Sequence, residues 1–335
     1  MTVLVTGAAG FVGSAVVRKL VEQGASVRAF VRPTSDVDNL ADLPVELALG
    51  DVRHRPTIDR AIKGCEAVFH VAADYRLWVP ERDVMFESNV TGTRNVMEAA
   101  AEAGVPRIVY TSSVATLGLA EAGSAANEDT PATSADMIGP YKQSKFEAEA
   151  VVRAMVAEHG LRAVIVHPST PVGPWDRRPT PTGQIIVEAA TGHMPAYVDT
   201  GLNVVHVDDV ATGHLLALEH GKPGERFILG GENLALKEIL TEIARITGRP
   251  APRFQVPHNV VMPIAAMAEM WSRLSHREPF VTLDGVRLAR KRMYFSSSRA
   301  IDRLGYRPRP AVEAIAEAIH WFGRHGYLGR KSRSA

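Results

Sequence analysis

The sequence contains little cysteine, no excess charge of either sign and no long apolar run. Its 335 residues include one cysteine, Cys65, which excludes an intramolecular disulfide framework and a multi-cysteine metal site. Lys and Arg total 38 against 37 for Asp and Glu, so no overall basic field favours nucleic acid. The longest suspicious apolar stretch, Val260 to Ala268, contains Pro263 and is far shorter than the roughly 18 residues of a membrane span. We therefore expect no metal, no nucleic-acid partner and no membrane-spanning helix.

The start of the chain and its composition indicate a folded protein of the cytoplasm. The first residues, MTVLVTG, lack the basic stretch of a secretory signal, and a glycine-rich turn follows them. The lack of a disulfide framework fits a reducing compartment. Hydrophobic residues make up 46% and charged residues 22%, which is ordinary for a folded protein. At roughly 100–200 residues per domain, the length suggests two domains.

The first half of the chain alternates short apolar runs with helical periodicity. We predict strands over 2–6, 26–31, 45–49, 67–71, 107–111 and 162–167. We predict helices over 11–23, 84–103 and 141–159. Strands that alternate with helices of this length pair in parallel. The expected fold is therefore α/β, with a Rossmann-type doubly wound parallel sheet.

After Pro168 the pattern changes to a stretch rich in Pro, Gly and Thr. A further strand is predicted at 202–207, and helices near 236–247, 258–274 and 311–322. We assign 1–167 to a dinucleotide-binding domain and 329–335 to a solvated tail. Residues 168–328 are expected to form mainly a smaller C-terminal substrate lobe, with some segments returning to the sheet. Because ligands of open α/β sheets bind outside the carboxyl ends of the strands, the site is expected between the lobes.

A glycine turn is the first chemical signal. Gly7, Gly10 and Gly13 follow the first strand and open a helix with Phe11 and Val12. The first glycine permits the tight turn, the second lets the backbone approach a pyrophosphate, and the third lets helix and strand pack closely. The helix start then offers free N–H groups and a positive dipole end to phosphates. This context predicts a dinucleotide site.

The end of the second strand distinguishes NADP from NAD. NAD sites usually place an acid there for the ribose 2′-hydroxyl, whereas an arginine suits a 2′-phosphate. Here the acid is absent and Arg32 stands in its place, followed by the hydroxyls of Thr34 and Ser35. Asp36 and Asp38 follow closely and would weaken phosphate binding. We favour NADP, with NAD as the alternative.

Further segments fit a cofactor groove after the third and fourth strands. Asp51 could accept a hydrogen bond from the adenine amino group. Small residues after the fourth strand let the chain run close to the ribose. The groove residues expected here are Asp51, Val52, Val71, Ala72 and Ala73. His70 is equally well explained as a packed core histidine or as a functional one.

The second chemical signal is Tyr141 with Lys145 on a predicted helix. The i, i+4 spacing puts both side chains on one face. An ammonium beside a phenol favours the phenolate, so we expect Lys145 to lower the pKa of Tyr141 from about 10 towards neutrality. Tyr141 could then act as general acid or base. A hydroxyl from Thr111, Ser112 or Ser113, at the end of the fifth strand, can hold the substrate oxygen against Tyr141.

Taken together, these motifs resemble the extended short-chain dehydrogenase/reductase family over essentially the whole chain. The matching residues are Gly7, Gly10, Gly13, Asp51, His70 to Ala73, Asn89, Ser113, Tyr141, Lys145, His167-Pro168, Val172 to Pro174 and Val205 to Asp209. The resemblance implies that Ser113 rather than Ser112 is the catalytic serine. It also implies that the segment with Pro168, Thr170 and Val172 passes the nicotinamide carboxamide.

Longer segments resemble the hopanoid-associated sugar epimerases and the reductases similar to dihydroflavonol 4-reductase. They are residues 73–78, 110–118, 179–183, 199–203, 229–233, 277–280 and 295–297. Arg32 matches the 2′-phosphate arginine of the dihydroflavonol-reductase-like members. The resemblance implies a small-molecule or lipid-linked sugar substrate. The substrate contacts expected are Tyr75, Trp78, Thr180, Thr182 and His206.

Three functions remain open at this point. An epimerase oxidises a sugar carbon and returns the hydride with a tightly held cofactor, whereas a carbonyl reductase releases the oxidised cofactor. A cofactor-binding regulatory protein would need no intact Ser113, Tyr141 and Lys145. Nucleotide-sugar epimerases of the wider family usually carry an arginine where this chain has Leu202. The basic residues Arg287, Arg290, Lys291 and Arg292 are either a substitute for it or a solvated helix face.

The segment 257–274 carries three methionines and Trp271 among few charges. It is interpreted either as a core helix of the smaller lobe or as an adaptable apolar wall, since methionine is flexible and polarizable. As a wall it would line a channel for a hydrophobic substrate, open to the membrane surface. The oligomeric state is left open, with a homodimer as one option.

Overall fold

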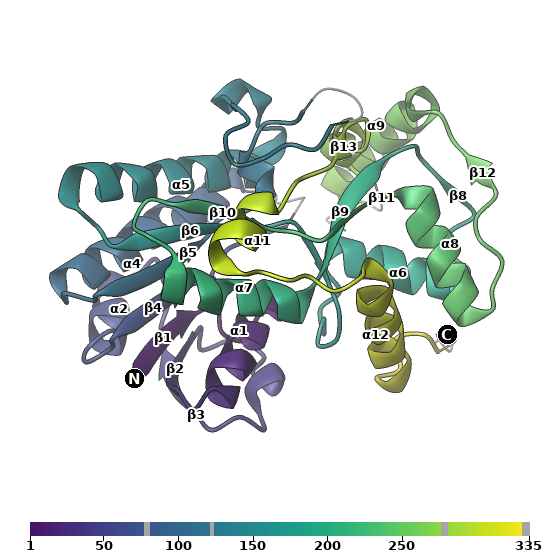
Figure 1. Ribbon diagram of the computed structural model, residues 1–335. Helices are drawn as coiled ribbons and strands as arrows, with labels where there is room; N and C mark the ends of the chain where they lie inside the picture. The colour runs from purple at the N-terminus through teal and green to yellow at the C-terminus, as the bar shows by residue number, and fades with distance from the viewer. Residues whose placement is uncertain (77–80, 121–123, 276–280, 330–335) are drawn as a thin grey trace.

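A seven-stranded parallel sheet forms the centre of the first half of the chain (Figure 1). The computed structural model describes residues 1–76, 81–120, 124–275 and 281–329. The strands are β1 Thr2–Thr6, β2 Ser26–Val31, β3 Val45–Leu49, β4 Ala67–His70, β5 Arg107–Thr111, β6 Ala163–Pro168 and β10 Arg226–Leu229. Their order is β3-β2-β1-β4-β5-β6-β10. This confirms the predicted doubly wound sheet. The four-residue β10, which pairs in parallel with β6, was not predicted.

Helices cover both faces of this sheet because its strands are apolar on both sides. In β1, Val3 and Val5 face one helical layer and Leu4 faces the other, as the two-residue period of a strand requires. The first layer contains α1 Phe11–Glu22, α7 Val207–His220 and α11 Ser298–Leu304. The second contains α2 Arg55–Ala61, α4 Gly92–Glu102 and α5 Gly139–His159.

The single helix predicted over 84–103 is interrupted. It consists of α3 Arg82–Phe86, a π-helical turn Glu87–Thr91 and α4. The buried Asn89 lies in the π-turn, and its side chain exchanges hydrogen bonds with the backbone of Asp74 and donates to Ser144 Oγ. π-Turns inside α-helices often occur at functional sites. Here the turn ties the loop after β4 to α5.

The smaller lobe is built around a second sheet and a separate apolar core (Figure 1). Its strands are β7 Thr170–Val172, β9 Gly201–His206, β11 Glu232–Ala235 and β13 Arg292–Met293, with a two-stranded pair of β8 Ala196–Tyr197 and β12 Phe254–Gln255. The core contains side chains of α6 Pro181–Thr191, α8 Leu236–Thr247 and α12 Ala311–Arg324. The elements α7, β10 and α11 lie after Pro168 in sequence but pack with the first sheet.

Two further helices, α9 His258–Ser275 and α10 Leu283–Ala289, pack against each other at the edge of the smaller lobe. The interpretation of the first as a core helix is wrong for its large side chains, since Met267, Met270 and Trp271 are exposed. Its buried positions include Ala265 and Ala268. Among the described residues, no helix is both long enough and apolar enough to cross a membrane.

Candidate active site

The glycine turn between β1 and α1 has the geometry of a dinucleotide site. Gly7 has φ +67°, and a Cβ there would lie 2.7 Å from the backbone of Ala72. A Cβ on Gly13 would overlap the Gly7 carbonyl oxygen. Gly10 is the N-cap of α1 and provides no side-chain cap, and the first turn contains no acidic residue. The first N–H groups of α1 and the positive end of its dipole are therefore left for an anion, which fits a pyrophosphate.

The other predicted groove residues lie at the ends of the strands around this turn. Ala72 follows β4, and its N–H donates to Thr6 Oγ1 at 3.3 Å. Val52 is buried and contributes to the core of the second helical layer. The remaining positions follow β4 or lie on α1, β6 and β7: Phe11, Val12, Val71, Ala73, Pro168, Thr170 and Val172.

The acidic residues after β2, which were expected to oppose a 2′-phosphate, are paired with an arginine. Arg32 is exposed. Asp36 and Asp38 both pair with Arg177, whose Nε lies 3.7 Å from the Asp36 carboxylate. The single positive charge of Arg177 thereby partly offsets the two negative charges that were expected to weaken binding of a 2′-phosphate.

Asp51, the expected adenine contact, is already paired. Arg53 donates from Nε to Asp51 Oδ1 at 3.0 Å and from its terminal nitrogen to Oδ2 at 2.7 Å. These hydrogen bonds hold the pKa of the Asp51 carboxyl below its usual value, with Arg32 nearby adding to the effect. A carboxylate has about four acceptor positions, so Asp51 keeps capacity for a further donor.

A set of contacts, which we name the clasp, joins the loop after β2 to the smaller lobe beside the glycine turn. It consists of Asp36, Asp38, Asn39, Trp175 and Arg177. Asn39 Nδ2 donates to the carbonyl of Ala9 at 3.3 Å and to that of Trp175 at 3.2 Å. The ion pairs of Arg177 complete it. Sequence reasoning missed the clasp because its halves lie more than a hundred residues apart.

The structure distinguishes the two serines after β5. Ser112 is buried, and its hydroxyl donates to Glu149 Oε2 at 2.6 Å. Ser113 Oγ accepts the N–H of Ala115 at 3.1 Å, and the serine is near enough to the Tyr141 hydroxyl to lower the pKa of that phenol. Ser113 is thus the serine placed to hold a substrate oxygen beside Tyr141.

Lys145 lies on the same helix but does not lower the pKa of Tyr141 as expected. Its Nζ donates to the carbonyl of Thr111 at 2.7 Å and lies 4.9 Å from the centre of the Tyr110 ring. Burial lowers the pKa of Lys145 to about 8, opposed by Glu149. Burial raises the pKa of Tyr141, and the hydrogen bond from Ser113 only partly offsets it. At neutral pH Tyr141 is therefore an uncharged phenol that can donate a proton.

Among the expected substrate contacts, Tyr75 lies near Tyr141. It interacts electrostatically with Tyr141, and burial raises its own pKa. Thr180 caps α6 instead: its hydroxyl accepts from Gly183 N–H at 3.1 Å and donates to the buried Asp176 at 2.9 Å. Thr182 is partly exposed in the first turn of α6. Trp78 lies outside the described residues.

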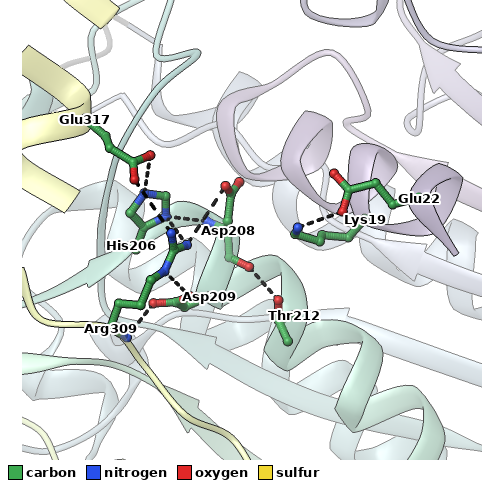
Figure 2. Close-up of polar contacts among 8 residues, drawn as sticks. All are labelled: Lys19, Glu22, His206, Asp208, Asp209, Thr212, Arg309 and Glu317. Carbon is green, nitrogen blue, oxygen red and sulfur yellow. Dashed lines mark hydrogen bonds and ion pairs between the residues drawn. The ribbon is translucent and has the colours of Figure 1, made fainter. Parts of the chain in front are cut away.

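The fifth expected substrate contact, His206, is buried at the start of α7 and is bonded to polar side chains that reach the surface (Figure 2). Its Nδ1 accepts the N–H of Asp208 at 3.0 Å and lies 2.9 Å from the Arg309 guanidinium. Its Nε2 lies 3.1 Å from the Glu317 carboxylate. Arg309 also donates to Asp209 at 2.9 Å. Both ring nitrogens are engaged, so we remove His206 from the proposed substrate contacts.

This combination of a dinucleotide turn with the Ser113, Tyr141 and Lys145 group agrees with a family model. The model described as NAD-dependent epimerase/dehydratase matches residues 3–230. The chain belongs to this family.

Individual relatives match over nearly the whole enzyme. It is 45% identical over 328 residues to a putative dihydroflavonol 4-reductase of Synechocystis sp., covering 97% of this chain and 95% of that one. It is 37% identical over 330 residues to sterol demethylase protein B of Methylococcus capsulatus, covering 98% and 100%. The crystal structure of gox2253 matches with a TM-score of 0.88 and 52% identity, over 97% and 99% of the two chains.

These findings confirm the predicted family. The protein is an NAD(P)-dependent enzyme of the extended short-chain dehydrogenase/reductase group, and the alternative of a regulatory protein without turnover is set aside.

The enzyme also contains a buried carboxylate that sequence reasoning missed. Glu149 Oε2 accepts hydrogen bonds from Ser112, from Thr116 at 2.8 Å and from His167 Nε2 at 2.9 Å. Burial disfavours its charge, but these partners hold its pKa below the usual value. A signal was present, because Glu149 continues the four-residue spacing of Tyr141 and Lys145. The carboxylate fixes the backbone turn that presents Ser113.

His70 is a core histidine in this structure. Its Nδ1 lies 2.7 Å from Thr6 Oγ1 and its Nε2 lies 2.9 Å from Thr93 Oγ1. Burial lowers its pKa from 6.5 to about 3, with a smaller effect of Lys145. An imidazole that stays neutral throughout the physiological range cannot be the proton donor, so its role is in packing.

We predict that the enzyme loses stability in acid through His70 and His214. Burial also lowers the pKa of His214, to about 4. Both histidines take up a proton near pH 6.5 when unfolded but remain neutral when folded, so stability falls as the pH drops from about 6.5 to about 4. The expected slope is up to about 1.4 kcal/mol per pH unit for each histidine.

Urea unfolding at pH 7 and pH 5 measures this slope. His214→Gln should reduce it, whereas the exposed-histidine control His193→Gln should leave it unchanged. An equal slope in the wild type and in His214→Gln would contradict the prediction.

Proposed function

We propose that the enzyme is an NADP(H)-dependent carbonyl reductase for a largely apolar substrate. The observation that carries this is the side chain of Leu202 on β9, which packs against the apolar core of the smaller lobe. An arginine there would anchor a nucleotide diphosphate by a charge-assisted hydrogen bond of roughly 1.5–3 kcal/mol. The names of two relatives, a putative dihydroflavonol 4-reductase and a sterol demethylase protein, support the same choice.

The chain's own residues account for the proton transfer and the positioning of substrate. The nicotinamide, when bound at the glycine turn, supplies the hydride. Ser113 holds the carbonyl oxygen of the substrate, and Tyr141 donates its phenolic proton to that oxygen as negative charge develops. Lys145 is held by the carbonyl of Thr111 and places a positive charge beside the same strand end. Glu149 accepts a hydrogen bond from Ser112 and thereby stabilises the turn that contains Ser113.

We predict that Arg32 determines the preference for NADP. Arg32→Ala should weaken NADP binding by roughly 1.5–3 kcal/mol, the scale of a charge-assisted hydrogen bond, and leave NAD binding almost unchanged. Titration calorimetry with both cofactors measures the difference, with the exposed Arg324→Ala on α12 as a control. An equal loss for both cofactors would give Arg32 a structural role and favour NAD.

A second candidate function, epimerisation with a retained cofactor, is favoured by the clasp. Contacts that join the loop after β2 to the smaller lobe beside the glycine turn would slow exchange of a bound dinucleotide. Arg177→Ala removes both ion pairs. We expect this variant to lose cofactor faster in stopped-flow dilution than the wild type, by up to about 30-fold, since two exposed charge pairs contribute up to about 1 kcal/mol each.

The experiment that separates the two functions follows the fate of the cofactor. The purified enzyme is assayed with NADPH against a panel of cyclic and long-chain ketones and, separately, against nucleotide sugars. A reductase consumes NADPH in equal amount to the alcohol formed. Turnover of a nucleotide sugar without net consumption of cofactor would overturn the reductase proposal and support the epimerase.

A further inference from the structure

Helix α9 exposes five of its large apolar side chains, while its buried positions carry small residues. The apolar face of α9 consists of Val260, Ile264, Met267, Met270 and Trp271, with exposed fractions of 53%, 44%, 66%, 64% and 69%. Four of them follow a 4, 3, 4 spacing and so lie on one side of the helix. The buried positions are Ala265, Ala268 and Ser272. A helix that served only the core would have the opposite arrangement.

A basic segment lies beside the first turn of this helix. Residues 281–293 contain four basic residues and one acidic residue, which gives a net charge of +3 (4 − 1). Arg290 donates to Asn259 Oδ1 on α9 at 2.8 Å. Arg287 pairs with Asp284, and the basic residue Arg292 pairs with Asp199. The exposed Arg290 and Lys291 have no ion pair within the part of the chain that the structure describes.

This surface borders the start of the catalytic helix α5. The Asp284 carboxylate of α10 would lie 3.1 Å from a Cβ placed on Gly139, two residues before Tyr141. Lys142, the residue after Tyr141, is close enough to Lys291 for the two charges to interact. In Figure 1, α9 and β13 lie together at the edge of the smaller lobe, while β3 lies at the far end of the first sheet.

We propose that the apolar face of α9 and the adjoining basic segment dock the enzyme on an anionic phospholipid surface. A helix with exposed Trp, Met and Ile beside Lys and Arg inserts its apolar side chains at the headgroup boundary while the cations attract anionic lipid. The substrate then enters the active site from the bilayer. This last step rests on the proposed function, because an apolar substrate is found in the membrane.

The charges favour a membrane over a second copy of the chain. A twofold dimer through this face would bring the same patch of both copies together. The exposed Arg290 and Lys291, which have no ion pair in the described part of the chain, would then lie near their counterparts, and these positive charges repel. An anionic bilayer supplies the opposite charge.

Vesicle sedimentation of the full chain without cofactor tests the docking. We expect binding to vesicles of phosphatidylcholine with 30% phosphatidylglycerol, little binding to phosphatidylcholine alone, and weaker binding at high salt. Met267→Gln/Trp271→Gln should lower the partition coefficient at least about tenfold through lost apolar burial. Arg290→Gln/Lys291→Gln should lower it about tenfold or more through lost attraction to the surface.

Matched variants test whether the loss of vesicle binding is specific to this surface or follows from removing any exposed apolar or charged side chain. Leu49→Gln removes an apolar side chain that is 60% exposed on the distant β3, and Lys222→Gln/Lys237→Gln removes two exposed charges elsewhere. Both controls should bind vesicles like the wild type. Thermal unfolding should be unchanged in every variant, because the altered side chains are exposed.

Three results would overturn the docking. They are no binding to anionic vesicles, equal loss in the controls, or concentration-dependent self-association in sedimentation velocity that Trp271→Gln abolishes. The last would make a second copy the occupant. The proposed function is tested separately with a water-soluble ketone, whose reduction should be the same in the docking variants and the wild type. If that reduction is absent while vesicle binding persists, the proposed function fails and the docking stands.

Discussion

Tyr141→Phe should lower the turnover number by at least about 10²-fold while changing cofactor affinity little. The ring and its packing remain, and only the phenolic hydroxyl is lost. A rate loss of about 10²-fold or more is the usual contribution of general acid catalysis. The hydroxyl is near enough to Ser113, the group proposed to hold the substrate oxygen, for that serine to lower its pKa. Steady-state rates with the ketone panel and calorimetric titration of NADPH give the two quantities.

The control for this variant is Tyr197→Phe, which removes a phenolic hydroxyl on β8 of the smaller lobe. It should leave turnover unchanged. Because burial raises the pKa of Tyr141, its proton should remain available at neutral pH, and the rate should fall only near pH 8, where Lys145 loses its charge. Near-normal turnover of Tyr141→Phe would remove this residue from the mechanism.

Glu149→Ala should cost about 3–5 kcal/mol in the free energy of unfolding. The substitution leaves the buried hydroxyls of Ser112 and Thr116 and the ring of His167 without their shared acceptor. Breaking a buried charged pair by removing one partner has this scale. Urea unfolding at neutral pH measures it.

Glu149→Gln keeps one acceptor oxygen and the side-chain volume, so it should recover part of the loss. Its neighbour Glu147 on the same helix is exposed, and Glu147→Ala should change stability by less than about 0.5 kcal/mol. A small loss for Glu149→Ala would show that the carboxylate does not hold the turn with Ser113. If Glu149→Gln folds, its turnover should fall more than its cofactor affinity, since Ser113 is repositioned.

Features that depend on residues close together in sequence were predicted well. The strands of the first sheet follow from short apolar runs, and the turn at Gly7 follows from three glycines whose spacing leaves no room for a Cβ. The pairing of Tyr141 with Lys145 on one helix face follows from the i, i+4 spacing. The strand β10 was missed because three apolar residues after Arg226, in an irregular stretch, carry too weak a pattern.

Features that depend on distant segments were not predicted. The pairing of Arg177 with Asp36 and Asp38 reduces the effect expected from the two acids, but nothing local links those positions. The expected lowering of the pKa of Tyr141 by Lys145 assumed that the ammonium faces the phenol. In the folded chain it faces the carbonyl of Thr111 instead.

The α/β architecture, the dinucleotide turn and the candidates Ser113, Tyr141 and Lys145 could be read from the chain alone, because periodicity and short spacings encode local backbone geometry. Folding sets which charges are paired, which serine is bound to Glu149 and which face of α9 meets solvent. Those outcomes depend on burial and on contacts between segments far apart in the chain. An amphipathic pattern indicates that one face of a helix is apolar, but whether that face is covered depends on the other elements that pack against the helix.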